Sequence, residues 1–397
     1  MNITIHRGTH QIGGCVTEIR TKKTRIFIDM GSELPDKDGN IVTETLSIDG
    51  ITKGEKNCDA VFFTHYHGDH IGMIASILPG VPMYMGKAAK EIYIILQKRV
   101  NREIVPIVET INTFEIAKKI QIGDITITPF MVDHSAYDAY MFLIEADGKK
   151  ILHTGDFRTH GFRGKGVIPT LKTYVKKVDV LITEGTMLSR NPELTKTEHM
   201  LQGEFRKLIS EYKYVFVICS STNIDRIASL HKSTPRGKYF LSDRYQKEVT
   251  DVVIKYAAEY SSLYSLKKVL FYNKAIKEKV QEIGFCMLVR GNDQFKEIMQ
   301  EYRDTHNSEC LVIYSLWEGY LNQPDSRYKE LIEGFQNVSH IHTSGHATLQ
   351  AIDQVCRTVA PSQAIIPIHS ENPERLNSLD LPYHIEYLKD GQVYEVK

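Results

Sequence analysis

One short stretch of the sequence gathers the residue types that bind metal ions. Residues 65–70 read His-Tyr-His-Gly-Asp-His and directly follow the apolar run 60–63. Neutral imidazole and carboxylate both bind zinc and similar borderline metals. The apolar run predicts a strand buried on both faces, and Gly68 permits the tight backbone that a crowded strand-to-helix turn needs. Four side chains are therefore candidate ligands of one metal site: His65, His67, Asp69 and His70. The spacing disfavours the alternative, a polar loop that holds histidines by chance.

The pattern HxHxDH resembles the signature of the metallo-β-lactamase-fold hydrolases. Three further matches follow the order of that family. Asp29, in Phe27-Ile28-Asp29-Met30-Gly31, resembles the strand-end aspartate that supports the metal ligands from behind. His134 resembles the next metal ligand, and Asp156, in Thr154-Gly155-Asp156-Phe157, resembles the carboxylate that bridges two metals. Each residue alone would be an ordinary turn or polar residue, and their joint occurrence favours the metal site.

The last part of the chain narrows the resemblance to the β-CASP group, which includes ribonuclease J. Glu184, His346 and His369 resemble the acid and the two histidines of that group's motifs A, B and C. The stretch 219–226 resembles its Ser/Asn/Arg loop at a helix start, where backbone N–H groups favour a phosphate. Its candidate substrate contacts are Ser220, Ser221, Asn223 and Arg226. The alternative interpretation of this stretch is simple capping of the helix that follows.

The resemblance implies two divalent metal ions, zinc with manganese as the alternative. The implied ligand sets are His65, His67 and His134 for the first ion and Asp69, His70 and His369 for the second, with Asp156 bridging both. Asp69 would also orient the attacking hydroxide. His346 would donate a hydrogen bond to the developing oxyanion or leaving group, with a helix-capping histidine as the alternative. Asp29 and Glu184 would fix the tautomers of the metal-bound imidazoles.

The pattern of apolar residues changes character near residue 191. The first part is rich in strands, whereas the stretch after 191 alternates helical and strand patterns, which predicts a parallel sheet. The resemblance implies an α/β (α+β) protein: an αββα metallo-β-lactamase sandwich from 1–190 and 341–397, interrupted by a β-CASP domain at 191–340. Expected helices are 86–100, 197–211, 223–232, 245–260 and 347–359, and expected strands include 125–132, 140–146, 150–153, 179–183, 214–219 and 364–368.

Charge and cysteine usage limit the class of protein. The 397 residues hold 49 Lys+Arg and 49 Asp+Glu, so no global basic field attracts nucleic acid. A local excess of six positive charges at 231–280 is either a solvated helix face or a nucleic-acid contact. The same two interpretations apply to the basic residues Arg158, Arg163 and Lys165. The start of the chain resembles a strand rather than a signal peptide. No apolar run approaches the ~20 residues of a membrane span. The six cysteines are scattered and lack CxxC spacing. We therefore expect a reduced, cytoplasmic protein that does not contact a membrane.

The function that these features favour is a metal-dependent nuclease acting on single-stranded RNA, with DNA as the second choice. A hydrolase of a small phosphodiester or ester, or a catalytically weak binding subunit, are the alternatives. The implied ligand positions are all filled, which disfavours the binding subunit, and the inserted domain disfavours a small substrate. The sequence departs from ribonuclease J in lacking its TGxQGEP segment, and the chain ends soon after His369. A homo-oligomer remains an open alternative.

Overall fold

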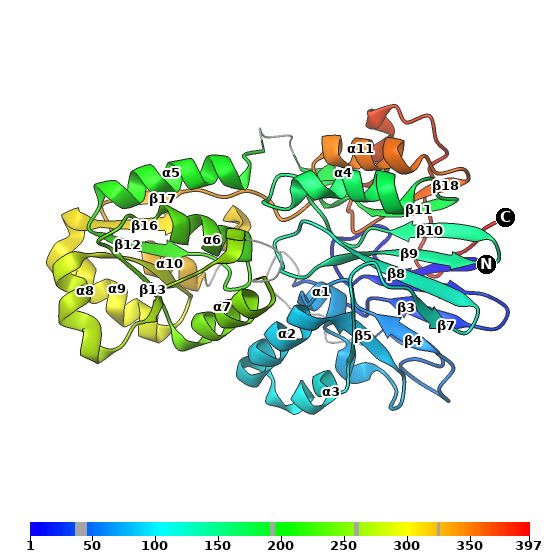
Figure 1. Ribbon diagram of the computed structural model, residues 1–397, viewed down its shortest axis with the longest axis horizontal. Coiled ribbons are helices and arrows are strands. Elements are labelled where there is room, and N and C mark those ends of the chain that lie inside the picture. The colour runs from blue at the N-terminus through cyan, green and yellow to red at the C-terminus, as the bar shows by residue number, and fades with distance from the viewer. Residues whose placement is uncertain (36–45, 191–194, 258–261, 324–325) are drawn as a thin grey trace. The chain divides into compact units, whose positions relative to one another are not determined.

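The computed structural model describes residues 1–35, 46–190, 195–257, 262–323 and 326–397. These residues divide into two compact units (Figure 1). The first unit combines the chain up to residue 190 with Gly345–Lys397, and the second is Thr195–Ser344. The first unit is thus built from both ends of the chain. That the second unit is a β-CASP domain stays a prediction.

Two stacked sheets form the first unit. One sheet has the order β19-β1-β2-β3-β4-β5-β6 and the other β18-β11-β10-β9-β8-β7. The strands of the first are β1 Asn2–Arg7, β2 Val16–Arg20, β3 Arg25–Ile28, β4 Ala60–Phe62, β5 Met83–Gly86, β6 Asn112–Phe114 and β19 Val393–Glu395. The strands of the second are β7 Ile120–Ile122, β8 Ile125–Met131, β9 Tyr140–Ala146, β10 Lys149–His153, β11 Val180–Glu184 and β18 Ala364–Ile368. Between them, Phe62 and Phe142 meet edge to face at 5.7 Å.

The second sheet is buried on both faces because its strands are apolar at nearly every position. In β9, Phe142 and Ile144 point into the core between the sheets, whereas Met141 and Leu143 point to the outer face. This alternation is the two-residue period of a strand. Helix α11 (Leu349–Val359) covers the outer face together with α4 (Val167–Thr170) (Figure 1). The result is the helix-sheet-sheet-helix layering that the sequence predicts.

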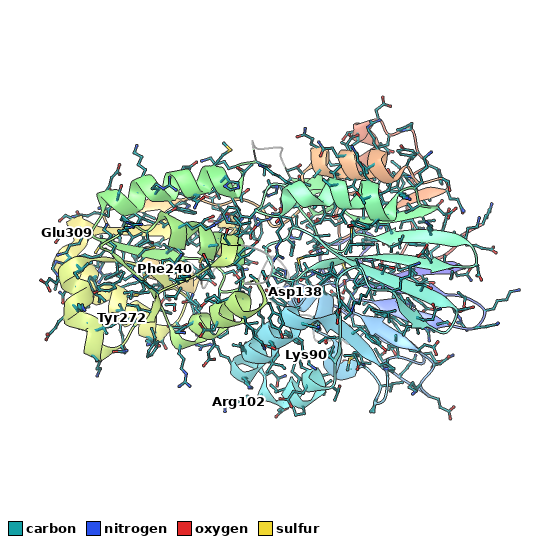
Figure 2. The ribbon with its side chains drawn as sticks, in the orientation of Figure 1. Lys90, Arg102, Asp138, Phe240, Tyr272 and Glu309 are labelled. Carbon is teal, nitrogen blue, oxygen red and sulfur yellow. The ribbon has the colours of Figure 1, made fainter. Side chains whose placement is uncertain are left out.

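Three helices accompany the first sheet. They are α1 Gly68–Ile71, α2 Lys87–Val100 and α3 Val105–Glu109. The buried carboxylate of Asp138, labelled in Figure 2, accepts a hydrogen bond of 2.9 Å from the backbone N–H of Ala89 in the first turn of α2. The Tyr140 hydroxyl donates to the same carboxylate at 2.5 Å. This carboxylate satisfies a helix end and joins α2 to the loop before β9.

The second unit contains one parallel sheet of order β14-β13-β15-β12-β16-β17. Its strands are β12 Tyr214–Ile218, β13 Tyr239–Ser242, β14 Val269–Phe271, β15 Phe285–Val289, β16 Cys310–Tyr314 and β17 Val338–His340. The helices are α5 Glu198–Glu211, α6 Ile224–Ser233, α7 Arg244–Ala257, α8 Lys277–Ile283, α9 Asp293–His306 and α10 Arg327–Ile332. Tyr214 and Phe216 pack against Tyr302 of α9. The alternation of strands and helices confirms the predicted fold class. The start of the expected domain 191–340 and the end of the expected helix 245–260 lie outside the described residues, since residues 191–194 and 258–261 are not described.

Some basic residues of 231–280 take part in local ion pairs. Lys247 pairs with Asp251 along α7, and Lys277 of α8 pairs with Glu301 of α9, each at 2.6 Å. For these two residues the pairing favours the solvated-helix interpretation. Arg158, in contrast, is fully buried and pairs with Asp133 at 3.2 Å. It is therefore neither a solvated residue nor a nucleic-acid contact, the two alternatives that the sequence leaves open for it. Among the described residues, no helix is long and apolar enough to cross a membrane.

Candidate metal centre

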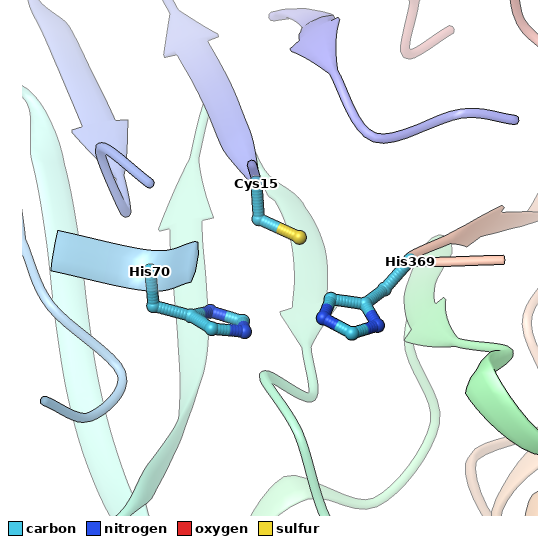
Figure 3. Close-up of side chains that lie close together, drawn as sticks. All are labelled: Cys15, His70 and His369. Atoms are coloured by element: carbon cyan, nitrogen blue, oxygen red, sulfur yellow. The ribbon is translucent and has the colours of Figure 1, made fainter. Parts of the chain in front are cut away.

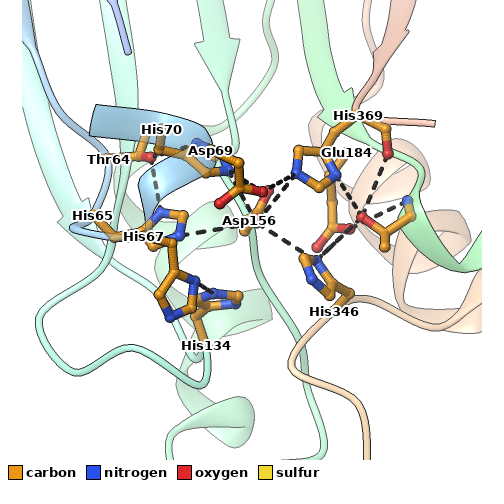
Figure 4. A network of polar contacts seen from close by, with 12 residues as sticks. Thr64, His65, His67, Asp69, His70, His134, Asp156, Glu184, His346 and His369 are labelled. Carbon is orange, nitrogen blue, oxygen red and sulfur yellow. Dashed lines mark hydrogen bonds and ion pairs between the residues drawn. The ribbon is translucent and has the colours of Figure 1, made fainter. Parts of the chain in front are cut away.

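The ends of six strands in the first unit carry the predicted ligands and the residues predicted to support them. On the first sheet, Asp29 follows β3 and residues 64–70 follow β4. On the second sheet, His134 follows β8, and Asp156, Glu184 and His369 lie at the ends of β10, β11 and β18. Figure 4 shows the labelled side chains of this set, among them His65, Asp156 and His369, converging from both sheets. The fold thus brings Asp69 and His369, 300 residues apart in the chain, to 3.1 Å between Oδ2 and Nε2.

Three histidines form the first group of donors. Nitrogens of His65, His67 and His134 all lie within 4.8 Å of one another, a spacing that could hold one metal ion. The Nδ1 of His134 donates to the backbone carbonyl of Gly345 at 2.7 Å. That bond leaves Nε2 of His134 directed into the group, 3.3 Å from Nδ1 of His67. Gly345 therefore selects the tautomer that a metal ligand needs.

A second group centres on Asp156. Its Oδ2 lies 3.2 Å from Nε2 of His70, 3.8 Å from Nε2 of His369 and 3.9 Å from Nε2 of His65. Asp69 approaches the same imidazoles, at 3.1 Å from His369 and 3.9 Å from His70. One carboxylate thus faces imidazoles of both donor groups, which is the position that a bridging ligand occupies.

Asp29 holds this arrangement from behind. Its carboxylate accepts hydrogen bonds from the backbone N–H of Thr64 at 2.7 Å, the Thr64 hydroxyl at 2.8 Å and Nδ1 of His70 at 2.7 Å. These bonds direct Nε2 of His70 toward Asp156. Asp29 itself has a φ of +62°, and His369 has a φ of +54°, a region that non-glycine residues rarely occupy. Such backbone geometry clusters at functional sites.

Glu184 and Thr186 tie the loops of the second sheet together. Oε1 of Glu184 accepts from the backbone N–H of Phe157 at 2.9 Å and of Ala347 at 3.2 Å. Its Oε2 lies 3.1 Å from Nδ1 of His346. The Thr186 hydroxyl lies 2.8 Å from Nδ1 of His369 and 3.2 Å from Nδ1 of His346. The loops that carry Asp156, His346 and His369 are therefore joined by two side chains.

The electrostatics of the site suit a bound cation. Burial lowers the pKa of His65 and of His134 well below the ordinary value, and it lowers the pKa of His67 to about 4. These three imidazoles are therefore neutral, which is the form that binds a metal ion. Burial alone would raise the pKa of Asp156, yet the surrounding imidazoles hold it well below its ordinary value. For His70, burial lowers the pKa, but Asp156 and Asp29 outweigh burial and raise it well above the ordinary value.

Three buried atoms that could bind a metal ion show whether such ions fit the site. Nε2 of His65, Nε2 of His70 and Oδ2 of Asp156 are shielded from solvent and make no hydrogen bond. Unpaired buried polar atoms are costly, and each of these three faces the others across distances a metal ion would span. The chemistry of the set, imidazole and carboxylate, matches zinc and related ions. The residues present therefore fit a divalent metal centre.

His346 stands at the edge of the centre with 22% of its side chain exposed. Its Nδ1 lies 3.1 Å from Glu184 and 3.5 Å from Asp156. Burial lowers the pKa of His346, but these two carboxylates outweigh burial and raise it to about 8. The imidazole thus combines a fixed Nδ1 with an exposed edge, as a residue that meets substrate requires.

The predicted substrate loop lies in the second unit, between β12 and α6. Asn223 caps α6, since its Oδ1 accepts from the backbone N–H of Arg226 at 3.2 Å. The Arg226 guanidinium is fully buried and pairs with Glu198 at 3.0 Å. This pairing gives Arg226 a structural role. Ser220 bonds the nearby Thr222 hydroxyl at 3.0 Å, and Ser221 is buried with an unpaired hydroxyl. Substrate contact by this loop stays a prediction, and the geometry of Arg226 does not support it.

Some contacts of the centre carry no sequence signal. Thr64, Thr186 and the Gly345 carbonyl each orient a histidine, yet single residues of these types are common in any chain. Cys15, just before β2, lies close to His70 and His369. Only the juxtaposition of loops from distant parts of the chain reveals these four.

Comparison with known families matches residues 25–218 to the beta-lactamase superfamily domain. The chain is 21% identical over 390 residues to ribonuclease J of Mycoplasma genitalium, with 92% of this chain and 67% of that protein covered. It is 24% identical over 409 residues to ribonuclease J of Helicobacter pylori, with 94% of this chain and 56% of that protein covered. An RNase J-like protein of Methanocaldococcus jannaschii is 30% identical over 202 residues, which cover 46% of this chain and 42% of that protein.

A solved structure shares the fold. The crystal structure of a protein of unknown function from Enterococcus faecalis V583 matches with a TM-score of 0.80 and 22% identity, and the match covers 99% of both chains. At this identity the match shows the fold alone. Together with the sequence relatives, it confirms the resemblance inferred from the motifs.

Proposed function

We propose that this chain, which matches the beta-lactamase superfamily domain and is similar to ribonuclease J, is a two-metal nuclease that hydrolyses phosphodiester bonds of single-stranded RNA. Its family and its His/Asp clusters make it a metal-dependent hydrolase. The observation that carries the proposal is the convergence of buried imidazole nitrogens, which have no hydrogen-bond partner, on the carboxylate of Asp156.

The residues divide by role. His65, His67 and His134 would hold one ion, Asp69, His70 and His369 the other, and Asp156 both. When bound, such a pair of divalent ions lowers the pKa of water and stabilises the attacking and leaving oxygens of an in-line displacement. We assign zinc to the site, with manganese as the alternative. The six cysteines are free, which supports a reducing compartment, the cytoplasm.

The side chains around the ions would do the remaining chemistry. Asp69, at the rim of the cluster, would orient the attacking water by accepting its hydrogen bond. His346, held through Nδ1 by Glu184, would donate from its exposed edge to the oxygen that gains charge as the phosphorus–oxygen bond breaks. Asp29 and Thr186 would keep His70 and His369 in the metal-binding tautomer.

The test uses purified protein stripped with a chelator and reloaded with zinc or manganese. The substrates are 5′-labelled single-stranded RNA, single-stranded DNA of the same sequence, and bis(p-nitrophenyl) phosphate as a small phosphodiester. We expect RNA cleavage that the chelator abolishes and the metal restores. Release of mononucleotides or of internal fragments would separate exonuclease from endonuclease action. Turnover of the small phosphodiester with RNA left intact would overturn the nuclease proposal.

Two ligand variants complete the test. Asp156→Ala and His67→Ala should each lower RNA cleavage by a factor on the order of 10²–10³ or more and reduce the metal content. His384→Ala removes a histidine whose side chain is 62% exposed and pairs with Glu386, so it serves as the matched control. Full activity in either ligand variant would contradict the two-metal centre.

A further inference from the structure

A buried thiol lies beside the proposed metal centre and has no role in the scheme above. Cys15 precedes β2 and is 2% exposed. Its Sγ and one nitrogen each of His70 and His369 all lie within 4.8 Å of one another. Figure 3 shows the thiol directed toward the space between the two imidazole rings.

The backbone that places the ligands also places this thiol. The backbone N–H of Cys15 donates to the carbonyl of Asp69 at 3.0 Å, and the carbonyl of Cys15 accepts from Gly31 at 3.0 Å. The N–H of His369 donates to the carbonyl of Gly8 at 2.7 Å. A Cβ at Gly8 would lie 3.5 Å from Sγ of Cys15, so this turn packs closely on the thiol. The position of the sulfur relative to His70 and His369 is therefore set by several bonds.

A second observation points to a ligand at this place. Nε2 of His70 and Oδ2 of Asp156, both buried, make no hydrogen bond. The buried thiol of Cys58, in contrast, behaves as an ordinary core cysteine, because it donates to the carbonyl of Ala60 at 3.4 Å. The thiol of Cys15 instead lies beside His70, whose buried Nε2 has no hydrogen-bond partner.

We propose that Cys15 is a thiolate ligand of the second metal position, beside His70 and His369, and that this sulfur makes the position favour zinc over manganese. Soft thiolate ligands favour zinc, whereas manganese prefers carboxylate, carbonyl and water oxygens. On binding, the S–H bond breaks, the proton passes to solvent, and a sulfur lone pair forms the bond to the ion. The inference rests on the metal centre proposed above.

The direct test is spectroscopic and uses the full chain. In zinc-loaded protein, X-ray absorption should detect a sulfur neighbour at about 2.3 Å. In cobalt-substituted protein, a sulfur-to-cobalt charge-transfer band should appear in the near ultraviolet. The band should vanish in Cys15→Ser and Cys15→Ala and persist in Cys58→Ser, the matched control for a buried thiol in the same unit. The measurement on unmodified protein does not depend on how the variants fold.

Metal competition provides the second measurement. We expect Cys15→Ser to lower the zinc-over-manganese affinity ratio by about 10–100-fold, measured by metal analysis after equilibrium dialysis. Bound metal with only nitrogen and oxygen neighbours would overturn the role of Cys15 while leaving the nuclease proposal intact. Protein that binds no divalent metal would overturn both. RNA cleavage without a sulfur neighbour would likewise separate the two proposals.

Discussion

His346 is the residue whose chemistry the geometry constrains most tightly. Its Nδ1 faces Glu184 and Asp156, and 22% of its side chain remains exposed. Donor atoms of His134, Asp156 and His346 also lie within 4.8 Å of one another, so a ligand role competes with a role in contacting substrate. A variant can distinguish these two roles.

We expect His346→Ala to lower kcat for RNA cleavage by about 10²–10⁴-fold with the metal content unchanged. The reason is that the variant removes a hydrogen-bond donor to the developing oxyanion and none of the proposed ligands. Single-turnover cleavage and elemental analysis of the same sample provide the measurement, with His384→Ala as control. Loss of metal in His346→Ala would instead assign this histidine to the ligand set.

At the scale of elements, the end of β3 and helix α1 must fit together closely to form the centre. Gly31 follows β3, and a Cβ there would lie 1.8 Å from the carbonyl oxygen of Asp69. Backbone bonds from Met30 to His70 and from Ser32 to Gly68 join the same two segments. The loop after β3 therefore holds α1 in place, and with it the proposed ligands Asp69 and His70.

Replacing this glycine should separate the two segments. We expect Gly31→Ala to destabilise the protein by at least about 1–3 kcal/mol and to weaken metal binding, because backbone atoms must move to admit the methyl group. Gly68→Ala is the matched control. The sequence suggests that this turn needs a glycine, but Gly68 has no positive φ and a Cβ there would meet no atom within 4 Å, so alanine fits and favours the helix. Urea unfolding and metal titration would check both variants. Equal stability of the two variants would contradict this account of the packing.

Glu18 links the first three strands through charge. Its Oε2 accepts hydrogen bonds from Nε2 of His6 and from the Arg25 guanidinium, each at 2.8 Å. Burial alone would raise the pKa of Glu18, but these two partners outweigh burial and lower it from 4.5 to about 2. A depressed pKa stabilises the folded state fully above pH 4.5, and this stabilisation is lost as the pH falls toward 2.

A pH series can isolate this contribution. We expect Glu18→Gln to lower the free energy of unfolding by about 1–2 kcal/mol at pH 7, a value reduced for solvent screening. The difference between wild type and variant should shrink as the pH falls from 4.5 to 2. Urea unfolding at each pH measures it. A difference that stays constant across this range would show that the carboxylate charge does not contribute.

The longer elements follow from sequence patterns, whereas several short ones do not. The expected strands 140–146 and 364–368 match β9 and β18, because long apolar runs are strong signals. The three-residue strand β6 and the four-residue strand β5 lack a pattern long enough to detect. In the centre, the clustered histidines are visible in the sequence. Thr186 and Cys15 are not, since only loop juxtaposition gives them their partners.

At the scale of the whole molecule, the two units have separate hydrophobic cores. The first unit buries two clusters, on either face of its second sheet, and the second unit buries its own between β12, β15 and α9. The proposed metal ligands all belong to the first unit. A ligand stabilises the structure that binds it, by about 2.7 kcal/mol at a concentration of 100 Kd.

Zinc should therefore stabilise the two units unequally. We expect hydrogen exchange of metal-free protein to slow on zinc addition in peptides from residues 60–70, 150–160 and 364–370, where opening would release the ion. Peptides from the core strands β12 and β15 of the second unit should change little, because their cluster contains no proposed ligand. Asp156→Ala, which lacks the proposed bridging carboxylate, should show a much smaller zinc effect in the first unit. Equal protection of both units by zinc would mean that they open together, and the separate cores would then not be separate units of stability.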